Sequence, residues 1–209
     1  MYRKCIKRTL DILIALIALP FFLFVFIVVA PIIKLTDGGP VFYNAPRLGK
    51  KGKVFRMMKF RSMRVNAPDL RNADGSTLNS ENDPRVTKIG RFIRKTSIDE
   101  LPQLLNILFG HMSLIGPRPV LPTVLYDQLP ELTQKRLAVR PGITGYAQAY
   151  YRNSIGQQEK FEHDCYYIDH ISFKLDIKVL VQTVRSVPKQ DNIYISQETE
   201  AGKDPTQIS

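Results

Sequence analysis

Residues 10–33 read LDILIALIALPFFLFVFIVVAPII, an apolar run whose one charged residue is Asp11. A helix of this length can cross the hydrocarbon core of a bilayer. Basic residues flank both ends of the run, so the distribution of positive charge assigns no orientation; they are Arg3, Lys4, Lys7 and Arg8 before it and Lys34 after it. The run predicts a membrane-inserted segment, which we place at residues 1–36.

Two prolines bear on how this segment meets the membrane. Pro20 lies near the middle of the run, where it removes a helix hydrogen bond and favours a kink. A kinked helix with two basic ends can enter one leaflet and leave through the same face. A plain single-pass anchor is the alternative, because membrane helices tolerate proline. A cleaved signal peptide is disfavoured, since residues 28–30 lack a small-x-small pattern and Pro31 follows.

Composition limits the class of protein. The 209 residues, 44% of them hydrophobic, suit one domain with a substantial core. A net charge of +11 and a pI near 9.7 imply an anionic partner, whether nucleic acid, anionic lipid or a phosphorylated small molecule. Cys5 and Cys165 form neither a disulfide framework nor a C-x-x-C pair, which favours a reducing, cytoplasm-facing compartment. The three histidines form no convincing catalytic set.

The rest of the chain predicts an α/β domain, mainly helical with a few short strands, at residues 37–189. Short strands are expected at 41–43 and 54–57, on either side of a basic loop. A polar loop is expected at 67–83, and a polar tail occupies 190–209.

Two helices with mixed faces are expected. In the first, 88–95, the basic residues take one face and Ile89, Phe92 and Ile93 take the other. Such a helix can lie on anionic headgroups, or it can present a solvated face while packing on the core. The second helix, 173–187, has apolar residues whose expected use is core packing, namely Leu175, Ile177, Leu180, Val181 and Val184.

Residues 96–104, TSIDELPQL, contain the adjacent carboxylates Asp99 and Glu100. Ser97 and Glu100 match a capping box, and Pro102 suits a first helical turn, so the pair can simply start a helix. Successive helical residues project about 100° apart. The two carboxylates can therefore address different targets, one attacking an electrophile while the other holds a divalent metal.

Arginines on both sides of this stretch favour the chemical interpretation. Arg94 lies just upstream, and Arg118 lies in GPRP, residues 116–119, where two prolines stiffen the loop. Arginine pairs bidentately with phosphate oxygens. A carboxylate is ionised at neutral pH, and magnesium with arginines would offset its repulsion from a phosphate. The sequence thus predicts an enzyme that acts on a phosphorylated substrate at a membrane surface.

Five motifs in order carry a family resemblance: KFRSM at 59–63, DPRVT at 83–87, GRFIRKTSIDELPQ at 90–103, MSLIGPRP at 112–119 and VRPGITG at 139–145. The chain resembles the bacterial sugar transferases, and more closely the small monotopic phosphoglycosyl transferases. The resemblance implies transfer of a sugar-1-phosphate from a UDP-sugar to a polyprenol phosphate, usually undecaprenyl phosphate, with release of UMP. It implies work on the cytoplasmic face of the bacterial inner membrane, at the start of glycan or glycoconjugate assembly.

The resemblance also implies roles for residues. Asp99 matches the nucleophile that forms a covalent phosphosugar intermediate, and Glu100 matches its partner carboxylate; both are expected to hold Mg²⁺. Phosphate or substrate contacts are expected from Arg94, Arg118, Lys59 and Arg140, the last toward the nucleotide end.

For the membrane helix, the resemblance implies a re-entrant path. Its break is expected at Pro20, with Lys7 and Arg8 at the headgroups. Some members break at a Ser-Pro pair, and that register here reads Leu23-Phe24. The expected partners are a UDP-sugar, undecaprenyl phosphate and phospholipids, with no nucleic acid.

Two other classes explain less of the sequence. A membrane-tethered nucleic-acid binder accounts for the charge, but not for Asp99-Glu100 or the arginine motif, and no nucleic-acid-binding motif is found. A scaffolding membrane protein accounts for the apolar run alone. Neither the sugar, the glycan pathway nor the oligomeric state is encoded in a motif.

Overall fold

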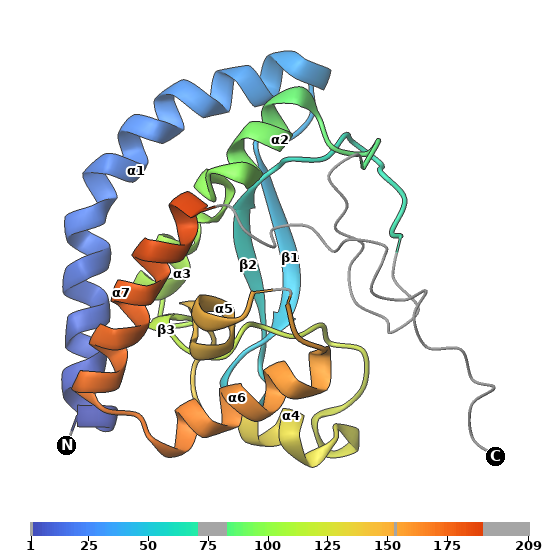
Figure 1. Ribbon diagram of the computed structural model, residues 1–209. Helices are drawn as coiled ribbons and strands as arrows, with labels where there is room; N and C mark the ends of the chain where they lie inside the picture. The colour runs from blue at the N-terminus through green and yellow to red at the C-terminus, as the bar shows by residue number, and fades with distance from the viewer. Residues whose placement is uncertain (1, 71–82, 153, 190–209) are drawn as a thin grey trace.

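The computed structural model describes residues 2–70, 83–152 and 154–189. Figure 1 shows one long helix, α1, curving along one side of a domain of shorter helices and short strands. The described residues contain more helix than strand, so the expected class, α/β and mainly helical, is confirmed. The tail at 190–209 and most of the loop expected at 67–83 lie outside the described residues.

α1 (Lys7–Asp37) is one continuous helix that follows a π-helical turn at Tyr2–Ile6. The helix is not interrupted at the expected break, because Pro20 and Pro31 both lie inside it. A proline removes a backbone hydrogen bond without ending the helix, and α1 bends over the domain in Figure 1. The helix ends at Gly38, whose φ of 71° suits a residue without a Cβ.

One face of α1 packs on the domain and the other is exposed. Phe22 and Phe26 lie against Phe42 and Phe60, with ring centroids 5.6 to 6.2 Å apart. Among the described residues, α1 is the one helix long and apolar enough, by length and composition, to cross a membrane. Its outer face exposes large apolar side chains, including Ile17, Phe21, Phe24, Ile27 and Leu35.

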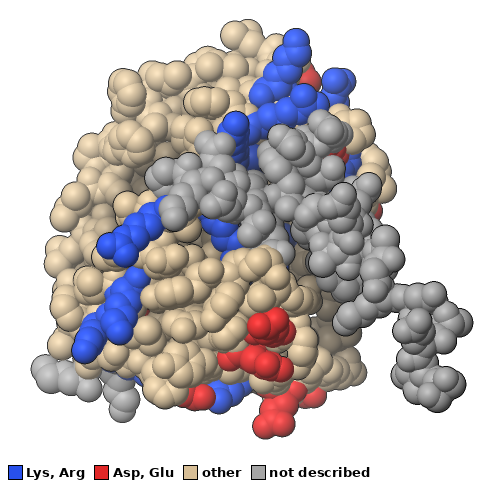
Figure 2. All heavy atoms as spheres, in the orientation of Figure 1, with Lys and Arg blue, Asp and Glu red and all other residues tan. Residues whose placement is uncertain are grey.

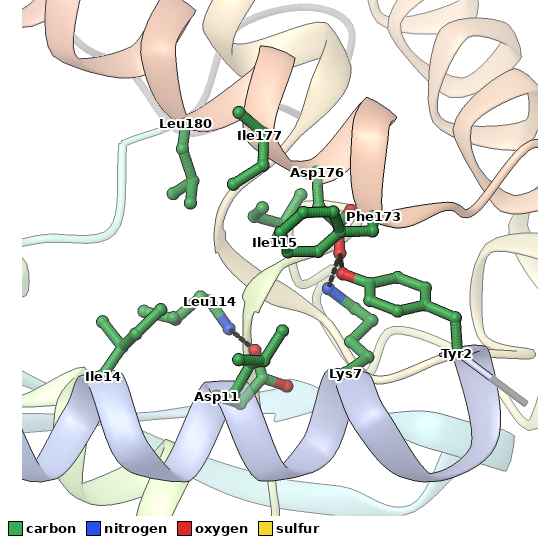
Figure 3. A pocket seen from close by; sticks show the side chains of 11 residues that line it. Tyr2, Lys7, Asp11, Ile14, Leu114, Ile115, Phe173, Asp176, Ile177 and Leu180 are labelled. Carbon is green, nitrogen blue, oxygen red and sulfur yellow. Dashed lines mark hydrogen bonds and ion pairs between the residues drawn. The ribbon is translucent and has the colours of Figure 1, made fainter.

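Both ends of α1 are bound to the same domain. At the start, Lys7 Nζ lies 2.8 Å from the Asp176 carboxylate, and the Tyr2 hydroxyl donates to the same oxygen (Figure 3). At the end, the Arg61 guanidinium donates to both oxygens of Asp37, one of them at 2.6 Å. This pairing holds the pKa of Asp37 below its usual value. The same domain therefore holds the helix at both ends.

A β-hairpin lies beneath α1. β1 (Phe42–Leu48) pairs antiparallel with β2 (Val54–Phe60), and a short turn at Lys50–Gly52 connects them. The strands expected at 41–43 and 54–57 are confirmed, and both are longer than the apolar pattern indicated.

α2 (Lys88–Lys95) confirms the first mixed helix, and the Thr87 hydroxyl caps it by accepting from the Gly90 N–H at 2.9 Å. The expected division of its faces is wrong at one position. Ile93 is fully buried, but Phe92 is 56% exposed, because the two side chains project in different directions from successive positions.

α7 (Phe173–Lys189) confirms the second mixed helix, and its expected core in part, because Leu175 and Leu180 pack on a core cluster. Val179 is fully buried and Asp176 nearly so. Three residues expected inside are exposed instead: Ile177, Val181 and Val184. The remaining helices are α3 (Gln103–Leu108), α4 (Glu131–Arg136), α5 (Tyr146–Tyr150) and α6 (Gln157–Asp169), with a 3₁₀ turn at Tyr126–Gln128.

A second sheet supports the loop at residues 116–119, which contains Arg118 and is called the arginine loop below. β3 (Ser113–Ile115) pairs in parallel with β4 (Gly142–Thr144). Asp11 of α1 is buried and holds β3. Its carboxylate accepts from the Ser113 hydroxyl at 2.8 Å. It also accepts from the Leu114 N–H at 3.0 Å (Figure 3). The charged residue in the apolar run is thus a link between α1 and the strand that leads to Arg118.

Candidate active site

Five of the predicted residues form one cluster, with the two carboxylates among three cations. Glu100 Oε1 accepts from Lys59 Nζ at 2.6 Å and lies 3.9 Å from Arg118 Nη1. The charges of Lys59, Arg94 and Arg118 all act on Asp99. Lys59 comes from β2, Arg94 from α2 and Arg118 from the loop after β3, so three separate parts of the chain meet here.

The two carboxylates lie on a turn between α2 and α3, not in a capping box. Ser97 has a φ of 58° and its side chain makes no cap hydrogen bond, so the capping interpretation is wrong. A 3₁₀ turn at Ile98–Glu100 follows, and Pro102 stands at the N-cap of α3 rather than in its first turn. Since neither carboxylate is used to cap a helix, both are available to the cations around them.

The electrostatic environment separates the two carboxylates. Asp99 is 9% exposed, and burial raises its pKa to about 6, against the opposing effect of Lys59. Burial also acts to raise the pKa of Glu100, but Lys59 and Arg118 outweigh it, and that pKa lies below its usual value. Glu100 is therefore ionised throughout the neutral range, while the charge on Asp99 depends on pH near 6.

Buried polar residues hold the cluster in place, and sequence reasoning missed two of them. Asn106 of α3 accepts from the Met58 N–H at 2.8 Å and donates to the Arg56 carbonyl at 2.9 Å, which fixes β2 beside Lys59. The Ser62 hydroxyl accepts from Arg94 Nε at 2.8 Å. An asparagine inside an apolar helix is unusual, and this signal in the sequence could have indicated that Asn106 binds a neighbouring backbone.

Arg140 is placed elsewhere. Its Nε donates to the Gly110 carbonyl at 2.7 Å, and it is not among the cations acting on Asp99 or Glu100. Arg140, with Lys51 and Arg3, lowers the pKa of Lys50, after the larger effect of burial. The arginine therefore belongs to a basic group beyond the end of α3.

The motif that contains Arg140 supports the arginine loop through its glycines. A Cβ on Gly142 would lie 2.2 Å from the Gly116 nitrogen, and one on Gly145 would lie 2.3 Å from the Gly116 carbonyl oxygen. Only glycine permits this approach of two backbones.

Lys7 and Arg8 have partners inside the protein. Lys7 pairs with Asp176, as described above, and the Arg8 guanidinium lies 3.5 Å from the carbonyl oxygens of Leu108 and Met112. Arg8 thus lies near the C-terminal end of α3, where a cation is favourable.

Charge is unevenly distributed on the face in Figure 2. Lysine and arginine side chains lie over the upper and left parts of this face, and acidic side chains gather in the lower part, where α4 and α6 lie. Among the described residues, no group of three or more His, Cys, Asp and Glu side chains is placed to hold a metal. Asp99 and Glu100 carry two adjacent carboxylates, and Mg²⁺ is commonly held by one or two carboxylates with substrate phosphates and water.

Comparison with known proteins identifies the family. The profile of the bacterial sugar transferase family matches residues 2–190. The chain belongs to this family, and it is a phosphoglycosyl transferase, as its motifs predicted.

The chain is similar to curated members of the family from several bacteria. The chain is 44% identical over 191 residues to the uncharacterized sugar transferase EpsL of Bacillus subtilis, covering 90% of each chain. It is 42% identical over 187 residues to the UDP-N-acetylgalactosamine-undecaprenyl-phosphate N-acetylgalactosaminephosphotransferase of Aeromonas hydrophila, covering 87% of this chain and 43% of that protein. It is 37% identical over 207 residues to the undecaprenyl-phosphate galactose phosphotransferase of Salmonella typhimurium, covering 91% of this chain and 42% of that one.

Proposed function

We propose that this enzyme transfers a sugar-1-phosphate from a UDP-sugar to undecaprenyl phosphate, releases UMP, and so initiates a bacterial glycan or glycoconjugate. The observation that carries the proposal is the Asp99–Glu100 pair held among Lys59, Arg94 and Arg118. The names of the Aeromonas and Salmonella relatives both include undecaprenyl phosphate, which supports the choice of acceptor. The name of the Aeromonas relative includes a UDP-sugar, which supports the choice of donor.

The mechanism is a two-step displacement at Asp99. A carboxylate oxygen of Asp99 forms a bond to the β-phosphorus of the donor, while the bond from that phosphorus to the bridging oxygen breaks and UMP leaves with the electron pair. A phosphate oxygen of the lipid acceptor then attacks the same phosphorus, and the Asp99 carboxylate is released. Arg118, whose side chain is 59% exposed, is free to bind the incoming diphosphate, and Arg94 adds a second cation.

Lys59 and Glu100 have supporting roles in this mechanism. The Lys59–Glu100 pair keeps Glu100 ionised beside the nucleophile. Asp99 and Glu100 would together hold Mg²⁺, with the remaining ligands supplied by substrate and water. When bound, this ion would offset the negative charge of the diphosphate. Arg140 binds the Gly110 carbonyl, apart from both carboxylates, and we keep it as a proposed contact for the nucleotide end of the donor.

We also propose that α1 is re-entrant and that the enzyme works on the cytoplasmic face of the inner membrane. A straight helix spanning the bilayer places its ends on opposite faces. Here the two ends are bound to one domain, through Lys7–Asp176 and Asp37–Arg61, which supports a path that enters and leaves on one side. The exposed apolar face of α1 would contact phospholipids between those ends.

UMP release tests the proposal. Purified protein in detergent is supplied with Mg²⁺, undecaprenyl phosphate and a panel of UDP-sugars. We expect sustained, multiple-turnover release that requires the lipid phosphate, with one donor or a few, and loss of release in Asp99→Asn. Asp169→Asn is the control, because Asp169 makes an exposed ion pair with Lys135 and should tolerate the change. Unchanged release by Asp99→Asn would overturn the mechanism.

A further inference from the structure

A buried ion pair lies behind the arginine loop, on helices to which the sequence assigned no function. Arg136, at the end of α4, binds Asp164 of α6 through Nη2 at 2.8 Å and Nε at 3.0 Å. Both side chains are almost fully buried. The guanidinium also lies 3.8 Å above the Phe161 ring. Burial acts to lower the pKa of Arg136 and to raise that of Asp164, and each residue offsets this effect in the other.

This pair binds the main chain of Arg118. Nη2 of Arg136 donates to the Arg118 carbonyl oxygen at 2.9 Å. The Arg118 main chain also acts on Asp164, whose pKa it lowers, favouring the ionised carboxylate. The ion pair therefore binds the main chain of the residue whose side chain faces Glu100.

The rest of the loop is held from the other side. The Gly116 N–H donates to the Thr144 carbonyl at 2.9 Å, and the Gly142 N–H donates to the Pro117 carbonyl at 3.0 Å. β4 thus binds the backbone of residues 116 and 117, and the ion pair binds the backbone of the next residue, Arg118. The Arg118 side chain itself is largely exposed, and its Nη1 lies 3.9 Å from Glu100 Oε1. This distance is too long for a hydrogen bond, so the side chain does not set the position of the loop.

We propose that Arg136 and Asp164 are positioning residues that fix the Arg118 backbone, so that its side chain meets the phosphates of the donor at the Asp99–Glu100 site. The inference rests on the proposed function, because it assigns the pair an effect on donor use through Arg118. A buried ion pair is often no more stabilising than apolar residues of similar volume, so stability alone is a weak reason for this pair.

A double-mutant cycle separates positioning from a general structural role. Asp164→Asn is made in the wild-type background and in Arg118→Ala, and kcat/KM for the donor is measured in each. If Asp164 acts through Arg118, we expect Asp164→Asn to lower kcat/KM at least tenfold in the wild type and less than twofold in Arg118→Ala. Equal fold-losses in the two backgrounds would overturn the proposal.

Two further variants keep the test decisive. Arg136→Lys retains a cation for Asp164 but not the planar fork that also reaches the Arg118 carbonyl; it should reproduce the same non-additive loss if Asp164→Asn does not fold. Asp169→Asn, on the same helix α6 but paired at the surface with Lys135, should leave kcat/KM within twofold in both backgrounds. Full activity in Arg136→Lys would contradict the positioning role.

The outcome is distinguishable from failure of the proposed function. If Asp99→Asn retained activity, the mechanism would fail regardless of the ion pair. If Asp99→Asn were inactive and Arg118→Ala impaired, but the losses were multiplicative, only the positioning role would fail.

Discussion

Asp99→Asn should make the protein more stable while abolishing its activity. The pKa of Asp99 is raised from 3.8 to about 6 by burial. Each pKa unit corresponds to about 1.4 kcal/mol, so the ionised carboxylate opposes folding by about 2 to 3 kcal/mol at pH 8. Asparagine removes that charge. For a chain of this size we expect the melting temperature to rise by about 5 to 10 °C at pH 8.

The pH dependence gives the sign of the effect. Well below pH 3.8, Asp99 is protonated in both the folded and the unfolded state, so the variant and the wild type should be equally stable. As pH rises through the window from 3.8 to about 6, the unfolded state loses its proton first, and the wild type becomes progressively less stable than the variant. Above pH 6 the difference is complete. The assay is thermal unfolding in detergent with EDTA, so that no divalent cation offsets the charge.

Glu100→Gln is the matched control, because its effect should have the opposite sign. Lys59 and Arg118 lower the pKa of Glu100, so the ionised carboxylate stabilises the fold above its usual pKa of 4.5, and this contribution is lost as pH falls below it. The glutamine variant should therefore melt lower than the wild type at pH 8. A melting temperature for Asp99→Asn equal to or below that of the wild type at pH 8 would refute this account of the site.

Three further results are expected. Lys59→Met should lower activity and move the acidic limb of the pH–rate profile to higher pH, because the lysine charge lowers both carboxylate pKa values; an unmoved limb would contradict this. Asp37→Asn leaves the buried Arg61 without its ionic partner, so the melting temperature measured by calorimetry should fall by several degrees. An unchanged melting temperature would contradict this. Gly90→Ala places a Cβ 1.9 Å from the Ser62 carbonyl oxygen, so it should lower the free energy of unfolding, measured by chemical denaturation, by about 2 kcal/mol or more. An unchanged free energy would show that the backbone moves to make room for the methyl group.

Much of the site could be predicted because its chemistry is encoded in short motifs. Adjacent carboxylates with flanking arginines identified Asp99, Glu100, Arg94 and Arg118, and the structure brings all four together with Lys59. The helix at 88–95 and both strands of the hairpin followed from local residue patterns.

The errors came from contacts between distant parts of the chain. The capping box failed because Lys59, some 40 residues away in sequence, binds the carboxylate that the box would have used. α7 exposes Ile177 although its pattern suits a core, since periodicity shows which residues share a face but not what that face meets. No local pattern could have shown that Arg136 and Asp164 bind the Arg118 backbone, because that contact joins three separate segments.

The most direct test of the central claim is exchange of labelled UMP into the UDP-sugar without any lipid acceptor. A covalent phosphosugar on Asp99 makes the first step reversible and independent of the acceptor, so the wild type should catalyse exchange with the same donor that supports UMP release. Asp99→Asn should catalyse none, and Asp169→Asn should match the wild type. UMP release that requires the lipid phosphate, with no exchange in its absence, would contradict the covalent mechanism and favour direct transfer between the two substrates.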